Sequence, residues 1–198
     1  MLAGVVLAAL AWGALFGLGR AGFWSRAAVA GVAIGAYGVV AQRATIGDLL
    51  RPTVADVAIG VAGAVVLYAV FWAGDYVLRR WVPPAAAHVD ELYEVRSVPS
   101  SQGLPAAVVV PVVGACEELF WRGFVQARAG FALALVAYAA VHVWERKAVL
   151  ILAAAVGGGF WGGLFAWRDT LVAPIVSHAL WDLAVVVWFP FGPKGGRD

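Results

Sequence analysis

The sequence predicts an all-α protein, a polytopic transmembrane helical bundle of about seven spans, with six to eight as the range. The first observation is composition. Hydrophobic residues make up 63% of the 198 positions and mean hydropathy is +0.87. Charged residues make up 13%, against roughly 25% in ordinary soluble domains. A soluble chain of this length has too little interior to hide so much apolar surface, so lipid must be the solvent for most of it.

The second observation is that the apolar residues gather in seven long runs. They occupy residues 1–19, 27–42, 55–78, 105–127, 130–144, 147–166 and 170–190. A helix needs about 20 residues to cross the hydrocarbon core, so the second and fifth runs are short and fit tilted, broken or partial spans. The first run has no Lys or Arg before it. It therefore predicts a transmembrane helix rather than a cleavable signal peptide.

The placement of Lys and Arg predicts the orientation. With the N-terminus outside, nine of these residues fall in the inner connections and four in the outer ones. Inner loops carry the excess of positive charge in membrane proteins, so the N-out/C-in arrangement is favoured. We expect a multi-pass protein of the cell membrane whose first partner is the lipid bilayer. A net charge of +2 without a basic run excludes a nucleic-acid partner.

The domain organisation follows from one polar segment. Residues 88–103 form either an amphipathic helix on the inner surface, with Leu92 and Val95 toward lipid, or an ordinary loop. We expect one integrated bundle in three parts. These are the N-terminal spans with the polar connection (1–103), the catalytic core helices (104–190) and a short polar tail (191–198).

A few ionisable residues lie away from the ends of the runs, in three motifs. These are EELFWR from Glu117 to Arg122, YAAVH from Tyr138 to His142, and HALWD from His178 to Asp182. Ionisable residues inside a membrane are costly and normally face the bundle interior, so a functional site is the default hypothesis. At about 1.5 Å of rise per residue, all three motifs fall near the middle of their spans. We expect them to converge.

Helical spacing sorts these side chains by face. Three pairs are four residues apart and share a face: Glu118 with Arg122, Tyr138 with His142, and His178 with Asp182. Glu117 is rotated by about 100° from its neighbour, so the two carboxylates point to different partners. Glu117 suits a general base acting on water, and His142 can hold that water. His178 can donate to a developing oxyanion. This set suits hydrolysis of an acyl bond, with the peptide bond as the obvious target.

These three motifs resemble those of the CPBP family, the CAAX-protease and bacteriocin-processing membrane proteins that include type II CAAX prenyl endopeptidases. The resemblance covers residues 104–188 and also includes the glycine-rich run before the third motif. In a membrane helix such a run predicts close packing against a neighbour. It implies intramembrane proteolysis by a glutamate-type endopeptidase with no cofactor and no catalytic metal. Its substrate would be a peptide or a membrane-associated protein.

The resemblance also implies roles for single residues. Glu117 is the general base, His142 helps it to activate water, and His178 with Asp182 forms the oxyanion side. The supporting residues are Glu118, Arg122 and Tyr138. The prenyl-protease branch has an asparagine in place of Asp182, and an ionised carboxylate only accepts hydrogen bonds. Asp182 is therefore protonated, orients His178, or helps to bind a cation, and the second role is favoured.

Other hypotheses stay open at this stage. A metal-dependent membrane protease could use Glu117, His142, His178 and Asp182 as ligands, although an H-E-x-x-H motif is missing. A non-catalytic membrane partner, a bacteriocin-immunity protein or a transporter accessory could use the same bundle. Cys116 is disfavoured as a nucleophile because a cysteine buried among apolar groups is usually inert. A rhomboid-type serine protease is disfavoured because its Gly-x-Ser element is missing.

Overall fold

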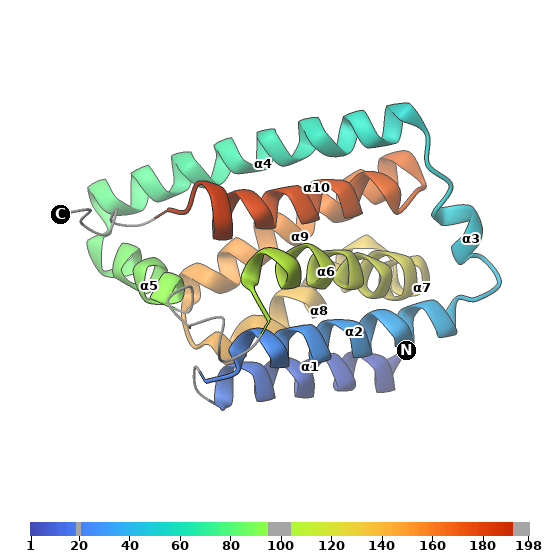
Figure 1. The fold of residues 1–198 in the computed structure, drawn as a ribbon, viewed down its shortest axis with the longest axis horizontal. Coiled ribbons are helices and arrows are strands. Elements are labelled where there is room, and N and C mark those ends of the chain that lie inside the picture. Colours follow the sequence, from blue (N-terminus) through green and yellow to red (C-terminus); the bar gives the residue numbers. More distant parts are fainter. Residues whose placement is uncertain (19–20, 95–103, 192–198) are drawn as a thin grey trace.

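Every predicted apolar run is helical in the computed structural model, which describes residues 1–18, 21–94 and 104–191 (Figure 1). The elements in chain order are α1 (Leu2–Gly17), α2 (Phe23–Ala41), α3 (Ile46–Leu49), α4 (Val54–Trp81), α5 (Pro83–Tyr93), α6 (Ala106–Glu118), the π-helix η3 (Leu119–Gln126), α7 (Ala127–Ala129), α8 (Phe131–Val141), the 3-10 helix η4 (His142–Glu145), α9 (Ala148–Arg168), α10 (Val172–Asp182) and the π-helix η5 (Leu183–Trp188). The described residues contain no strand, which confirms the all-α prediction.

Three of these helices, α2, α4 and α9, are long and apolar enough to cross a membrane. Shorter apolar helices cover residues 2–17, 131–145 and 172–188. The segment predicted as a short span at 27–42 begins earlier, at Phe23, because Gly22 adopts a positive φ of 66° and starts the helix there. The polytopic helical bundle is thus confirmed. The orientation, the exact number of crossings and the division into three parts stay predictions.

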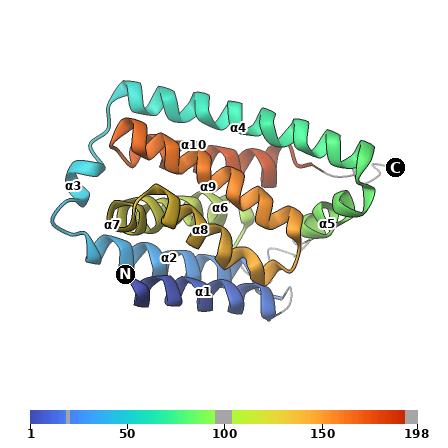
Figure 2. The same ribbon diagram turned by 180° about the vertical axis from the view of Figure 1, so that it is seen from behind.

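The motif-bearing helix α6 lies in the middle of the bundle. It packs between α2 and α10, while α4 covers the outer side of α10 and α1 packs on α2 (Figure 1). The reverse view shows α8 and α9 on the other side of the molecule, where they pack against each other (Figure 2). Helices far apart in sequence therefore surround the first motif.

For the polar segment at 88–103 the sequence allowed either a helix or a loop. Helix α5 covers residues 88–93 of this segment. It begins at Pro83, which a first helical turn tolerates because its N–H needs no partner there. Asp90 pairs with Arg79 of α4 at 2.7 Å, and Glu91 pairs with Lys147 before α9. Leu92, predicted to face lipid, lines a cavity, and its contact with lipid stays a prediction. Val95 with the rest of 88–103, and residues 192–198 of the predicted tail, lie outside the described residues.

Two glycines allow the close packing that the glycine-rich run predicts. A Cβ at Gly158 of α9 would lie 2.5 Å from Tyr138 Cδ1, so only glycine admits α8 this closely. A Cβ at Gly114 of α6 would lie 2.8 Å from Asp182 Oδ2 and 3.2 Å from the His178 ring. These two contacts bring the second and third motifs against the first.

Candidate active site

Glu117 ends its helix inside the bundle and faces α8. Its side chain is buried, and Tyr138 Oη donates a hydrogen bond of 2.9 Å to Glu117 Oε2. Tyr138 is itself buried, with Trp121 packed edge-on against its ring at a centroid distance of 5.4 Å. The orientation of the Glu117 carboxylate is therefore fixed by a neighbour from another helix.

Glu118 points into a different and fully buried environment. Its Oε1 lies 2.7 Å from His178 Nδ1 and 3.2 Å from Arg122 Nη1. Arg122 Nη2 also donates to the carbonyl oxygen of Gly158 at 3.0 Å. The pairing of Glu118 with Arg122 confirms the prediction from their spacing. A buried carboxylate is tolerable when it is paired, and Glu118 has an ion pair with Arg122 and a hydrogen bond to His178, both through Oε1, while Oε2 has no hydrogen-bond partner among the described residues.

His178 is held on three sides. Its Nδ1–H donates to Glu118, and Nε2 lies 3.8 Å from Asp182 Oδ2, which is longer than a hydrogen bond. Trp161 of α9 stacks on the imidazole, with centroids 3.5 Å apart and an interplanar angle of 15°. The Trp161 indole N–H donates in turn to Ser177 Oγ at 3.3 Å. The imidazole has little freedom to rotate.

Of the two ring nitrogens of His142, Nδ1 makes a hydrogen bond and Nε2 faces open space. Its Nδ1 lies 2.8 Å from the carbonyl oxygen of Tyr138, and because a carbonyl only accepts, Nδ1 carries the proton. The unprotonated Nε2 lies 3.9 Å from Glu145 Oε1. Sequence reasoning missed Glu145. Its place three residues after a motif histidine was the available signal, because the 3-10 helix η4 aligns residues three apart.

The three motifs converge on one cavity of about 250 Å³, called here the polar chamber. Its ionisable and hydroxyl-bearing lining residues are Glu117, Tyr138, His142, Glu145, His178 and Asp182. Glu118 and Arg122 are absent from that lining and lie behind it. The predicted convergence of the three motifs is thus what the helices produce, with one carboxylate facing the chamber and its neighbour holding a histidine; their depth in the membrane stays a prediction.

The geometry bears on two of the alternative hypotheses, a metal site and a cysteine nucleophile. Among the described residues, no group of three or more His, Cys, Asp or Glu side chains is gathered closely enough to hold a metal ion. The Cys116 thiol packs against α2, since a Cβ at Gly35 would lie 2.8 Å from its Sγ. Cys116 does not line the polar chamber, although it precedes Glu117 directly.

Comparison with protein families gives a match over the same region. Residues 99–184 match the family described as Type II CAAX prenyl endopeptidase Rce1-like. The matched segment contains all three motifs and every ionisable residue of the polar chamber, so it agrees with the resemblance drawn from those motifs. Comparisons with curated proteins and with solved structures gave no match.

The Rce1-like match supports a protease of the membrane in general terms. It agrees with the apolar helices, which indicate a membrane protein, and with a peptide as substrate. Residues before the match supply α2 and α4, whose packing against α6 and α10 places the motifs.

Proposed function

We propose that the protein is an intramembrane endopeptidase that hydrolyses a peptide bond with water activated by Glu117. One observation carries the proposal. A carboxylate and two imidazoles from three separate helices line one chamber, and each is oriented by a partner outside the reacting set. Packing alone does not require ionisable groups in an apolar bundle to share a cavity.

Glu117 is the general base of this reaction. The Tyr138 hydroxyl holds Oε2, so we assign Oε1 to the attacking water. His142 Nε2, which carries no proton, accepts the second hydrogen bond from the same water. Attack on the substrate carbonyl carbon transfers one proton of the water to Glu117. When the C–N bond breaks, Glu117 returns that proton to the leaving amine nitrogen.

His178 stabilises the oxygen that becomes negative. With Nδ1–H donating to Glu118, a second proton on Nε2 makes the ring a cation between two carboxylates, Glu118 and Asp182. Nε2–H then donates to the oxyanion. Asp182 Oδ2 lies 3.8 Å from Nε2, too far for a hydrogen bond, and its role is to favour the protonated ring by its proximity.

The substrate class is a peptide segment of a membrane-associated protein. The name of the matching family makes prenylated C-terminal peptides the first substrates to try. A non-catalytic membrane partner would use the same helices but would not depend on the ionisation of Glu117.

The test compares wild type with Glu117→Gln in nanodiscs on a quenched peptide library that includes prenylated peptides, with and without a chelator. We expect cleavage by wild type that is lost in Glu117→Gln and unaffected by the chelator. Loss of cleavage on chelation, restored by added Zn²⁺, would replace the proposal with a metalloprotease. Equal cleavage by both proteins would remove Glu117 from the mechanism.

A further inference from the structure

The polar chamber contains one carboxyl group that the proposed mechanism does not use, that of Glu145. It stands at the end of η4, three residues after His142, and lines the chamber. Only 9% of its side-chain surface is exposed, and its oxygens keep that surface open to the chamber. Its Oε1 lies 3.9 Å from the unprotonated Nε2 of His142, and it forms no hydrogen bond within the described residues. Buried polar groups are normally paired, so this carboxyl group indicates an occupant that pairs with it.

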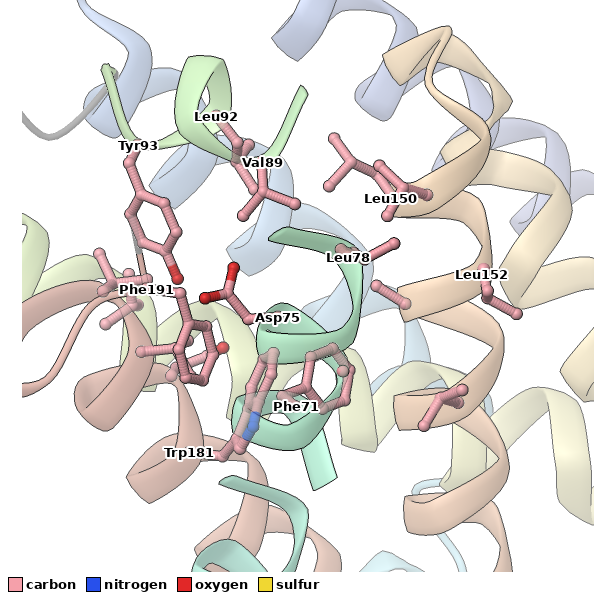
Figure 3. A pocket seen from close by; sticks show the side chains of 18 of the residues that line it. Phe71, Asp75, Leu78, Val89, Leu92, Tyr93, Leu150, Leu152, Trp181 and Phe191 are labelled. Atoms are coloured by element: carbon pink, nitrogen blue, oxygen red, sulfur yellow. The ribbon is translucent and has the colours of Figure 1, made fainter. Parts of the chain in front are cut away.

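Outside the three motifs, the other buried or half-buried acidic side chains of the described residues each have an arginine partner. They are Asp56, which pairs with Arg168 at 2.9 Å, and Asp75 and Asp90, which pair with Arg79 at 2.8 and 2.7 Å. Figure 3 shows Asp75 among the side chains that line an apolar cavity of about 430 Å³ next to the chamber. Burial of a carboxylate is costly unless a cation lies beside it, and this bundle provides the cation in those three cases.

Glu145 is the exception. Lys147, two residues later, forms its ion pair with Glu91 of α5 and none with Glu145. His178, on α10, lies between Glu118 and Asp182. No Lys or Arg from the described part of the chain lines the chamber. We therefore expect the missing cation to come with a molecule that enters the chamber.

The rest of the chamber lining indicates the shape of that cation. Trp12 and Phe16 of α1 and Phe23 and Trp24 of α2 line the same chamber. Lysine and arginine bury their methylene stems against such apolar surface and keep the charged head group at a polar partner. A metal ion has no such stem. A neutral donor such as an amide would leave an ionised Glu145 without a counter-charge.

The distance from Glu145 to the reacting atoms places this cation in the substrate. In the proposed mechanism His142 Nε2 accepts a hydrogen bond from the attacking water, so Glu145 Oε1 lies within about 7 Å of that water. An extended peptide advances about 3.3–3.6 Å per residue. The cationic residue therefore stands within about two positions of the scissile bond.

We propose that Glu145 is a specificity residue that binds an arginine or lysine side chain of the substrate near the scissile bond. The guanidinium or ammonium group donates to the ionised carboxylate and completes the ion pair that the other buried acids form within the protein. Glu145 belongs to none of the three motifs, so this charge requirement is additional to them. The proposal rests on the proposed function for the presence of a peptide substrate, and it adds the chemical class of that peptide.

Arginine and citrulline differ in charge but hardly in shape, so paired peptides isolate the ion pair. The probes are short apolar peptides that carry a single arginine, moved along the sequence, each with a citrulline twin. Binding is measured on Glu117→Gln protein in nanodiscs of zwitterionic lipid, so that no peptide is cleaved, with empty nanodiscs as the blank. At one or two adjacent positions we expect the arginine peptide to bind about tenfold more tightly than its twin, as a hydrogen bond to a charged group gives.

The variant Glu145→Gln, made in the same protein, removes the charge and keeps the side-chain shape. It should bring the ratio of the two Kd values to about one by weakening only the arginine peptide. The matched control, Glu91→Gln, removes a carboxylate outside the chamber and should keep the tenfold ratio. In cleavage by wild type the same preference should appear in KM, while kcat differs little between the twins.

Each other outcome is decisive. Equal binding of the twins at every position would overturn the inference and leave Glu145 a neutral carboxyl group. An arginine preference that persists in Glu145→Gln, or that is lost in Glu91→Gln as well, would also overturn it, as would the binding of no peptide. An arginine preference that depends on Glu145, without cleavage of any peptide by wild type, would contradict only the proposed hydrolysis.

Discussion

Two adjacent carboxylates in one helix lie in opposite kinds of surroundings. Glu117 faces the polar chamber and has one hydroxyl donor, Tyr138, on one of its oxygens. Glu118 faces protein on all sides, has no exposed surface, and contacts both Arg122 and His178. The difference teaches how the proposed mechanism divides the motif between two purposes. In that mechanism the first carboxylate is available for chemistry, and the second belongs to a buried network that holds the surrounding helices.

The strongest test of this contrast is a variant of Glu117 that loses peptide cleavage and keeps its fold. We expect Glu117→Gln to lower kcat by about a thousandfold, since general acid–base catalysis contributes at this scale. Because the amide keeps the Tyr138 hydrogen bond through its oxygen, the unfolding midpoint in detergent should not move. Peptide cleavage and tryptophan-fluorescence unfolding measure the two quantities. A lowered midpoint would give Glu117 the structural role assigned to Glu118.

The buried network should show the opposite pattern. Arg122→Leu removes the guanidinium beside the buried Glu118 carboxylate and leaves it His178 as a partner, and breaking such a buried pair costs about 3–5 kcal/mol of unfolding free energy. Unfolding in SDS, followed by fluorescence, measures this value. The matched control is Arg51→Leu, because Arg51 pairs with Asp48 at an exposed position and should cost less than about 0.5 kcal/mol. Equal stability of the two variants would mean that the buried pair does not hold the helices.

Tyr138→Phe tests whether the proposed base, Glu117, must be held in one orientation to act. The ring and its packing on Trp121 remain, while the hydroxyl that holds Glu117 Oε2 is removed. We expect kcat/KM to fall about tenfold, the value of one buried hydrogen bond. Tyr76→Phe, on the exposed side of α4, serves as the control and should keep full activity. Unchanged activity in Tyr138→Phe would show that Glu117 is oriented by other contacts.

The smallest change in kcat is expected at Glu145. Its carboxyl group lies 3.9 Å from His142 Nε2 and forms no hydrogen bond at this distance, so it does not fix the imidazole as the Tyr138 carbonyl does. We expect Glu145→Gln to change kcat about threefold, less than a lost hydrogen bond would. Glu91→Gln removes a similar charge beside Lys147 outside the chamber and should have no effect. A loss as large as that in Tyr138→Phe would place Glu145 in contact with the reacting water.

How far the site can be predicted depends on whether a contact lies within one helix or between helices. Glu118 and Arg122 had to share a face, because their spacing follows the helical period whatever the rest of the bundle does. The pairing of Glu118 with His178 is different, since sixty residues separate them. It requires particular rotations of α6 and α10 about their own axes. Nothing local in either segment specifies those rotations.

The same limit explains Trp161 and Glu145. The glycine-rich run predicted close packing, and Gly158 provides it, but the stacking of Trp161 on His178 depends on the register of α9 against α10. The predicted span ended at residue 144, just before Glu145. It enters the chamber because the helix tightens to a 3-10 turn at His142 and turns the following carboxylate inward.

The sequence by itself determined the membrane class, the helical segments, the three motifs and the pairs within each motif, because apolar length and helical period are properties of short stretches. Only the tertiary structure decided which carboxylate faces the chamber, which partners orient the two histidines, and that Glu145 lines the chamber without a Lys or Arg partner among the described residues. Those features arise where helices meet, and how helices meet is set by the packing of the whole bundle.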